Sequence, residues 1–324
     1  MEKSPPSEED VLHYFERFSN WGRWGENDQL GTINHITAAV RADAARLITS
    51  GVPISCGRPI ETGTTAEDVP GAAPPHRFML RSGEGLRDPA RVPPPGFAPD
   101  GRLAAASEYL GYAAHGYRIT HLDGLSHAFW DHHMYNGVPA ERVNAHQGAG
   151  HHGIENYQDG IVTRGVLVDV PRHRGVRWLE PGDGVTGPEV RAILAEQEVE
   201  VRAGDALLLR TGYGRKRAEL GADPPETGSA GWDASCLPLF HEWQISLCGA
   251  DTAQDVRPSP YPGIRSPIHA VGLVAMGMPL IDNADFERLA AHCAAQHRWS
   301  FFFTVAPLAV TGSTSSAVNP LAVF

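Results

Sequence analysis

A histidine-rich segment near the middle of the chain carries the residues best suited to chemistry. Residues 118–137 read RITHLDGLSHAFWDHHMYNG, with four histidines and two aspartates. Alternate side chains of an extended strand share a face, so His121 and Asp123 would point the same way. An imidazole and a carboxylate presented together suit Zn²⁺ or Mn²⁺. Two ligands do not complete a site, and a proton relay or a histidine-rich surface loop would contain the same residues.

Further polar residues must come from other parts of the chain. His115 lies on the same face as His121 and Asp123 if the strand continues regularly upstream. Asp251 and Asp255 follow a predicted strand, where sites in α/β proteins gather, but aspartates there also cap helices and turns. The residue pattern alone therefore leaves the remaining ligands open.

The bulk composition argues against nucleic-acid and membrane proteins. A formal net charge of −11 disfavours binding to a phosphate backbone, which needs a basic face. The N-terminal segment MEKSPPSEED is acidic and unlike a signal peptide, and no run reaches the ~20 apolar residues of a membrane helix. The four cysteines lack CxxC spacing, as expected of reduced thiols. We expect a cytoplasmic protein that acts on a small molecule, with neither nucleic acid nor membrane as a partner.

Helices and strands alternate along the part of the chain that must position these residues. Ser7 and the acidic residues after it predict the start of a helix, and a second helix is predicted over 37–50, ended by Gly51. This alternation indicates an α/β fold with a mixed sheet. Further helices are predicted from Thr186 and over 284–297, and buried strands are predicted at 161–170, 205–211, 244–250 and 301–310.

One segment interrupts this alternation. Residues from about 63 to 104 are rich in proline and glycine, which predicts a long loop or lid without regular structure over much of its length. No repeat or low-complexity linker divides the chain. We therefore expect residues 1–324 to form a single domain, with an N-terminal arm over about residues 1–50.

The segment THLDGLSH resembles the signature of a known family of enzymes. These are the metal-dependent cyclases and hydrolases that include bacterial kynurenine formamidase and isatin hydrolase, whose motif reads roughly H-x-G-T-H-x-D-x-P-x-H. The resemblance covers nearly the whole chain and implies the family's swivelling β/β/α fold and assembly as a homodimer or higher homo-oligomer. Other blocks similar to the family's longer members occur in the same order: SNWGRWGENDQLGTIN (19–34), GIVTRGVLVDV (160–170), GADTAQDVRPSP (249–260), SPIHAVGLVAMGMPLIDNADFERL (266–289) and GSTSSAVNPLAVF (312–324).

The resemblance also implies roles for individual residues. It implies His121 and Asp123 as metal ligands, and His127, at the closing histidine of the motif, as the general acid/base. His269 matches a histidine that binds metal in members with a second ion. Asp282 stands where a glutamate ligand is usual, so the carboxylate is kept but shortened by one methylene.

The chain departs from the family's motif at one ligand. The first motif histidine should fall at position 117, which is a tyrosine here. Tyr117 could itself bind the metal or hydrogen-bond a substrate, and His115, His132 or His133 could replace the missing histidine. The departure leaves open whether the protein binds metal in the family's manner, differently or not at all.

The resemblance implies a metal-dependent hydrolase of a C–N bond in a small aromatic amide, formamide or lactam, similar to an arylformamidase. Water activated by Zn²⁺ or Mn²⁺ would attack the carbonyl while His127 delivers a proton to the leaving nitrogen. One alternative is a cyclase or dehydratase of polyketide-type secondary metabolism, in which Tyr117 and His127 run acid/base chemistry with an altered or absent metal site. Another is a catalytically inactive binding protein on the same fold.

Overall fold

The computed structural model describes residues 5–63, 72–84 and 103–324. By its internal contacts the chain divides into two compact units. One contains Met1–Pro59, Ala66–Ala72 and Ala114–Phe324, and the other contains Ile60–Thr65 and Ala73–Ala113.

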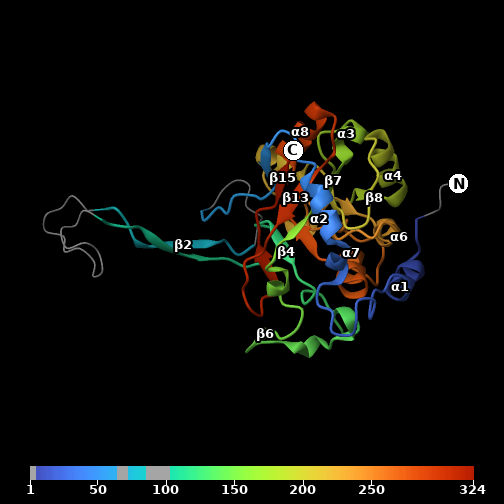
Figure 1. Ribbon diagram of the computed structural model, residues 1–324, viewed down its shortest axis with the longest axis horizontal. Helices are drawn as coiled ribbons and strands as arrows, with labels where there is room; N and C mark the ends of the chain where they lie inside the picture. Colours follow the sequence, from blue (N-terminus) through green and yellow to red (C-terminus); the bar gives the residue numbers. More distant parts are fainter. Residues whose placement is uncertain (1–4, 64–71, 85–102) are drawn as a thin grey trace. The chain divides into compact units, whose positions relative to one another are not determined.

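A nine-stranded mixed sheet forms the centre of the first unit (Figure 1). Its strand order is β1-β15-β13-β7-β9-β11-β12-β4-β14. The strands β7, β9, β11 and β12 run parallel, while the neighbours on either side of them pair antiparallel. This mixed α/β architecture confirms the predicted fold class. The strands are β1 Pro53–Ser55, β4 His121–Asp123, β7 Ile161–Asp169, β9 Ala206–Arg210, β11 Leu247–Ala250, β12 Leu280–Asp282, β13 Ser300–Val305, β14 Ser315–Ala317 and β15 Leu321–Val323.

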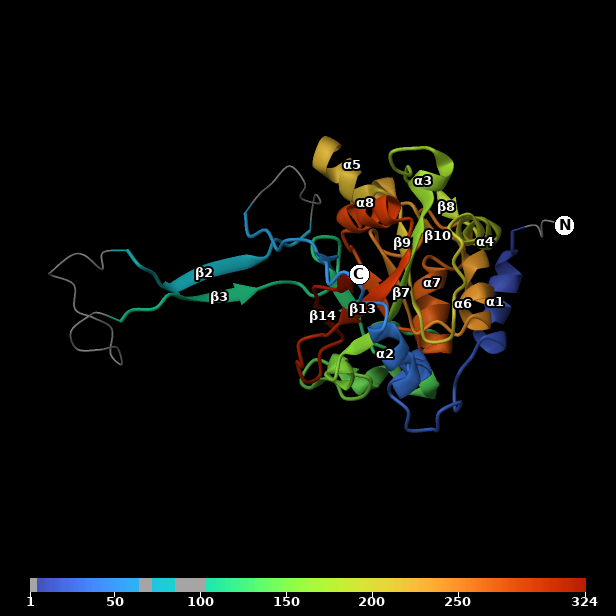
Figure 2. The same cartoon turned by 45° about the horizontal axis from the view of Figure 1, so that its top comes forward.

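Helices cover this sheet. Figures 1 and 2 show α1, α4 and α6 together on one side of β7. Both α2 and α4 pack against β7. The helices are α1 Glu8–Arg17, α2 Ala38–Ala45, α3 Val170–Arg174, α4 Gly187–Glu196, α5 Tyr213–Leu220, α6 Leu237–Glu242, α7 Pro267–His269, the π-helix η7 Ala270–Met276 and α8 Glu287–Gln296. The short 3₁₀ turns are η1 Gly31–His35, η2 Tyr135–Gly137, η3 Ala140–Arg142, η4 Ile154–Tyr157, η5 Pro225–Thr227 and η6 Ala234–Cys236.

The hydrophobic core lies along the parallel strands. Every residue of β9 and β11 is buried, as expected of parallel strands covered on both faces. The continuous apolar sequence of these strands is the reason that their positions could be predicted from the sequence. Two short strand pairs border the core: β8 Gly184–Val185 with β10 Gly231–Trp232, and β5 Val143–Asn144 with β6 Gly148–Ala149.

The predicted first helix is confirmed, and the second is shorter than predicted. Ser7 caps α1 in a capping box with Asp10. The helix that begins after Thr37 ends at Ala45 instead of reaching Ser50. Beyond it, the backbone N–H groups of Ser50 and Gly51 donate to the carbonyl of the C-terminal Phe324. This tertiary pairing competes with helix continuation and cannot be read from local sequence.

The second unit corrects part of the loop prediction. Strand β2 (His76–Arg81) lies inside the range 63–104 and pairs antiparallel with β3 (Ser107–Gly111). Of that range, residues 64–71 and 85–102 lie outside the described residues. Large apolar side chains are exposed on both strands of this hairpin: Phe78, Met79, Leu80, Tyr109 and Leu110.

The buried histidine His152 is expected to make stability depend on pH. Its side chain is buried, its Nε2 lies 2.9 Å from the Tyr135 carbonyl, and burial lowers its pKa from 6.5 to about 4. As pH falls from about 6.5 to about 4, the unfolded chain therefore takes up a proton that the folded protein does not. The free energy of unfolding should fall over this window by up to about 1.4 kcal/mol per pH unit.

Urea unfolding of chelator-treated protein at about pH 7 and about pH 5 tests this expectation. His152→Asn should show a smaller loss of stability between the two pH values than the wild type. The exposed His146→Asn serves as the control and should behave like the wild type. An identical loss in all three proteins would contradict the assignment.

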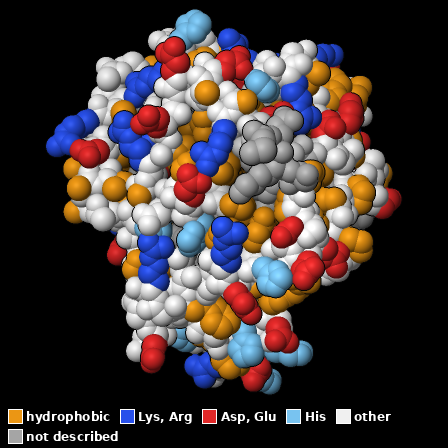
Figure 3. Space-filling model, turned by 90° about the vertical axis from the view of Figure 1, so that its right-hand side faces the viewer, with side chains coloured by type: hydrophobic (Ala, Val, Ile, Leu, Met, Phe, Trp, Pro, Cys, Tyr) orange, Lys and Arg blue, Asp and Glu red, His pale blue; other side chains and the backbone are white. Residues whose placement is uncertain are grey.

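Two surface properties bear on partners. Within the described part of the chain, no helix combines the length and the apolar character that crossing a membrane requires. On the face shown in Figure 3, Lys and Arg side chains are interspersed with Asp and Glu rather than gathered into one basic area.

Candidate metal centre

Strand β4 holds the centre of the site. It lies between two antiparallel neighbours, β12 and β14, which place Asp282 and Ala317 opposite His121, and Ser315 opposite Asp123. The His121 and Asp123 side chains are 2% and 1% exposed. Pairing on both edges fixes the register of a strand of only three residues, so a one-residue slip that would turn both side chains to the other face is prevented.

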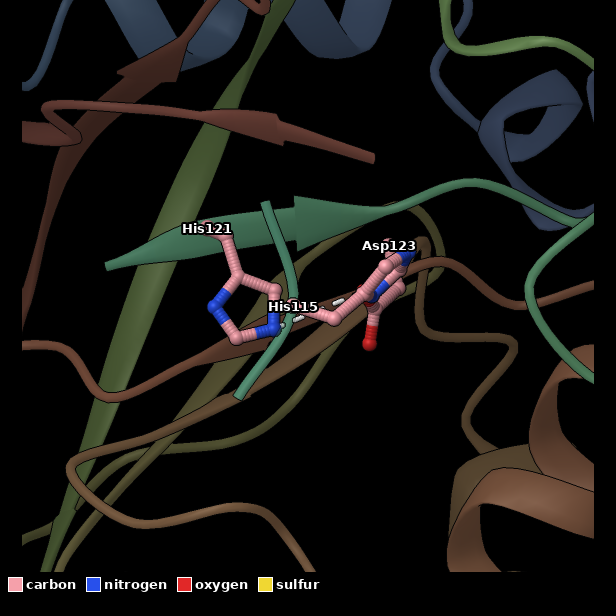
Figure 4. A group of neighbouring side chains, drawn as sticks. All are labelled: His115, His121 and Asp123. Carbon is pink, nitrogen blue, oxygen red and sulfur yellow. Dashed lines mark ion pairs between the residues drawn. The ribbon is translucent and has the colours of Figure 1, made fainter. Parts of the chain in front are cut away.

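His115, His121 and Asp123 form the first cluster of potential ligand atoms (Figure 4). The Asp123 Oδ1 atom is 2.9 Å from Nδ1 of His115 and 3.5 Å from Nε2 of His121. His115 lies outside β4, in irregular backbone where Gly116 has a φ of +110°. The prediction that His115 would join by a regular continuation of the strand is therefore wrong. A turn permitted by glycine brings it to the same place.

Asp123, His127 and His269 form a second cluster that shares the same carboxylate. The Asp123 Oδ2 atom is 3.9 Å from Nε2 of both His127 and His269. Asp282 lies between the clusters, with its Oδ2 atom 3.6 Å from Nε2 of His269 and 4.0 Å from Nε2 of His121. The structure thus brings together six of the residues named from the sequence: His115, His121, Asp123, His127, His269 and Asp282.

Hydrogen bonds outside the cluster orient three of the imidazole rings. Nδ1 of His121 lies 3.0 Å from the Ile119 carbonyl, and Nε2 of His115 lies 2.8 Å from Oγ1 of Thr314. Nδ1 of His269 lies 2.5 Å from Oδ2 of Asp255. In each ring the other nitrogen faces Asp123. An outer partner that fixes the ring and its tautomer is the usual environment of a metal-binding histidine.

The Asp123 carboxylate fits a bound cation. Both of its oxygens are buried, and neither has a hydrogen-bond partner among the described residues. Oδ1 is close to His115 Nδ1 without the alignment of a hydrogen bond. Burial alone would raise the pKa of Asp123, but His121 and His127 lower it below its ordinary value, so the group is ionised. A buried, ionised carboxylate that accepts no hydrogen bond from the described residues and faces imidazole nitrogens is a donor set suited to Zn²⁺ or Mn²⁺.

The electrostatics of the other two histidines differ. Burial lowers the pKa of His127 to about 4, so its ring is neutral at neutral pH. Although burial opposes a charge on His269, its contacts with Asp255 and Asp282 raise the pKa of His269 well above its usual value. These carboxylates create a negative potential at His269 Nε2, which also favours a metal cation there.

Asp255 and Gln254 are outer partners whose roles could not be predicted from the sequence. Asp255 is fully buried, accepts from the Ile268 backbone N–H at 2.7 Å and holds His269. Gln254 Nε2 donates to Asp282 Oδ1 at 2.9 Å. The only indication of these roles in the sequence is that both residues follow strand β11. Asp251, which follows the same strand, instead accepts from backbone N–H groups at the start of α5.

An irregular helix positions His269. His269 is the last residue of the short helix α7, and the π-helix η7 begins at the next residue. Wide helical turns of this kind are rare and often occur at functional sites. No sequence pattern predicted this geometry.

Tyr117 lies outside both ligand clusters. Its hydroxyl accepts a hydrogen bond from Nη1 of Arg257 at 2.8 Å, and the side chain lines a small cavity with Tyr213. His115 therefore stands among the potential ligands, and the residue at the family's usual position does not. The predicted catalytic role of Tyr117 remains a prediction.

Replacing Asp255 with asparagine is expected to weaken metal binding 10- to 100-fold, because His269 would lose the carboxylate that orients it. Competition with a chromogenic chelator measures this affinity. Ser266→Ala is the control, since the Ser266 hydroxyl accepts from Arg257 and is not a partner of His269. Unchanged affinity in Asp255→Asn would remove His269 from the ligand set.

Comparisons with known proteins place this geometry in a family. The model of a family described as putative cyclase matches residues 112–254. A protein whose crystal structure is described as that of a novel cyclase has 31% sequence identity to this chain. The two structures superpose with a TM-score of 0.83, and the match covers 96% of this chain and 99% of that one. No curated protein matches the sequence significantly.

Two more distant structures share the fold. Isatin hydrolase A from Labrenzia aggregata is 15% identical, with a TM-score of 0.59 over 90% of this chain and 98% of that one. Isatin hydrolase A from Ralstonia solanacearum is 16% identical, with a TM-score of 0.58 over 88% of this chain and 95% of that one. The sequence identity and the coverage with the structure described as a novel cyclase decide the assignment: the chain belongs to the cyclase family.

Proposed function

We propose that the protein is a metal-dependent hydrolase of a C–N bond in a small aromatic amide, formamide or lactam. The observation that carries this proposal is the Asp123 carboxylate, which is buried and accepts no hydrogen bond from the described residues, while ring nitrogens of four histidines face it. The names of the distant relatives, which include isatin hydrolases, agree with this class of reaction.

The side chains of the site would have two roles, metal binding and proton transfer. His115, His121, Asp123, His269 and Asp282 would hold the ion, which when bound polarises a carbonyl and makes water a better nucleophile. His127 is partly exposed, with 31% of its side chain accessible, and its ring stacks on His115 at a centroid distance of 3.8 Å. A neutral, accessible imidazole held beside the site can accept a proton from water at Nε2 and deliver it to the leaving nitrogen.

Turnover of three probes tests the proposal: formanilide, N-formylanthranilate and isatin. Protein loaded with Zn²⁺ or Mn²⁺ is expected to hydrolyse at least one of them: formanilide to aniline and formate, N-formylanthranilate to anthranilate and formate, or isatin to a ring-opened product heavier by one water. Chelation should abolish the conversion. Loaded protein that leaves all three intact, or conversion that persists after chelation, would contradict the proposal.

A cyclase or dehydratase activity is the second candidate, favoured by the 31% identical relative described as a cyclase. The same mass measurement separates the two reactions. Hydrolysis gives products whose summed mass exceeds that of the substrate by one water, whereas a dehydrating cyclisation gives a product lighter than the substrate by one water.

We also propose that the protein works in the cytoplasm as a homodimer or larger homo-oligomer. The four cysteines are free and buried, as in a reducing compartment. The β2–β3 hairpin has exposed apolar side chains on both strands, and a two-stranded ribbon is marginally stable alone. Light scattering should show that the double variant Phe78→Ser/Leu80→Ser has a lower mass than the wild type, with Arg77→Ser as the control. Equal masses would contradict assembly through this hairpin.

A further inference from the structure

We infer that the small cavity beside Tyr117 and Arg257 binds a carboxylate group of the substrate. The inference rests on the proposed function and narrows its substrate class to an amide that carries an acidic group. The cavity measures about 30 Å³. This is room for one or two water molecules, or for a carboxylate that replaces them. Its polar lining consists of Tyr117, Tyr213, Asp223, Ser229, Thr252, Arg257 and Asn283.

Arg257 provides the reason for a negative ligand. Its Nη1 donates to the Tyr117 hydroxyl at 2.8 Å and its Nη2 to the Ser266 hydroxyl at 3.0 Å. Its Nε is buried and has no partner among the described residues, and none of their carboxylates forms an ion pair with it. A half-buried guanidinium with only neutral partners is costly, and its planar fork matches a carboxylate.

The one carboxylate in the lining is already paired. Asp223 Oδ2 lies 2.8 Å from Nζ of Lys216. Among the described residues that line the cavity, Arg257 is thus the charged group without an ionic partner, which favours an anionic ligand over a neutral one.

The cavity is built by the same segments as the metal centre. Tyr117 lies between His115 and His121 in the chain, Asn283 directly follows Asp282, and Arg257 comes two residues after Asp255. Thr252 and Asn283 follow the carboxyl ends of β11 and β12, the edge where α/β sheets bind ligands. Asn283 Nδ2 also donates to the Gly116 carbonyl at 2.6 Å, which ties the turn carrying Tyr117 to this edge. A substrate whose amide reaches the centre would thus have its acidic group recognised here.

Calorimetric binding of benzoate to chelator-treated protein tests the inference without turnover and without a metal that could itself bind the anion. Benzamide is the neutral probe of matched shape. We expect benzoate to bind at least ten-fold more tightly than benzamide. Arg257→Met should lower the affinity for benzoate 10- to 100-fold, the range for a charge-assisted hydrogen bond, and leave the affinity for benzamide unchanged.

Three further variants keep the test decisive. Arg257→Lys should recover part of the benzoate affinity. Tyr117→Phe, which removes one hydroxyl, should bind benzoate several-fold more weakly than the wild type, and this result is informative even if Arg257→Met unfolds. Arg215→Met, with 47% of the side chain exposed, is the control and should bind like the wild type. Equal affinity for benzoate and benzamide, no benzoate binding, or unchanged affinity in both Arg257→Met and Tyr117→Phe would overturn the inference.

Failure of this inference can be told apart from failure of the proposed function. Benzoate binding that depends on Arg257, in a protein that hydrolyses none of the probes, would support the subsite and contradict the hydrolase. Hydrolysis of formanilide and N-formylanthranilate with equal kcat/KM in wild type and Arg257→Met would support the hydrolase and contradict the subsite.

Discussion

Asp123→Asn is expected to lose its metal and its hydrolytic activity together. Both ligand clusters use this carboxylate, with Oδ1 facing His115 and His121, and Oδ2 facing His127 and His269. The amide has nearly the same shape but no charge, and its NH₂ group would point hydrogens at the position of the ion. Metal affinity should fall by more than ~100-fold, beyond the effect of losing an outer partner.

Elemental analysis and turnover of the same preparation measure the two effects. Asp131→Asn is a matched control, because Asp131 is exposed in the same segment and belongs to neither cluster. A variant that keeps stoichiometric metal and activity would show that Asp123 is a structural carboxylate.

His127→Ala is expected to keep the metal and lose turnover by about 10²- to 10⁴-fold, the usual contribution of general acid/base catalysis. The ring lies beside the centre, but His115, His121 and Asp123 form a complete cluster without it. Removing the proton-transfer group should lower kcat more than it raises KM.

Metal content again decides how the result is interpreted. His133→Ala is the control, since this half-buried histidine contacts the Asp131 carbonyl and lies outside the clusters. If His127→Ala lost metal in proportion to activity, His127 would be a ligand instead of the proton carrier. Unchanged turnover would remove it from the mechanism.

The part of the site that could be predicted is the part that depends on local geometry. His121 and Asp123 share a face because side chains alternate along a strand, and this holds for β4 even though it has only three residues. The buried strands β7, β9 and β11 were predictable for a similar reason, since continuous apolar runs are typical of parallel strands. The resemblance to the family added His269 and Asp282, which no local pattern connects to β4.

What could not be predicted depends on tertiary contacts. The place of His115 follows from a turn at Gly116, and the role of Asp255 from the approach of α7. The early end of α2 follows from pairing with the C-terminal residue. The β2–β3 hairpin was missed because proline and glycine around it indicate a loop, while cross-strand pairing of 76–81 with 107–111 is not local.

The most direct test of a divalent metal centre on β4 is a calorimetric titration. Protein freed of metal by chelation is titrated with Zn²⁺ and with Mn²⁺, alongside a His121→Ala/Asp123→Ala variant of confirmed fold. The wild type should take up at least one ion per chain, and the variant should take up none at the same concentrations. Absence of uptake by the wild type, or equal uptake by both proteins, would contradict the assignment of this cluster as a metal centre.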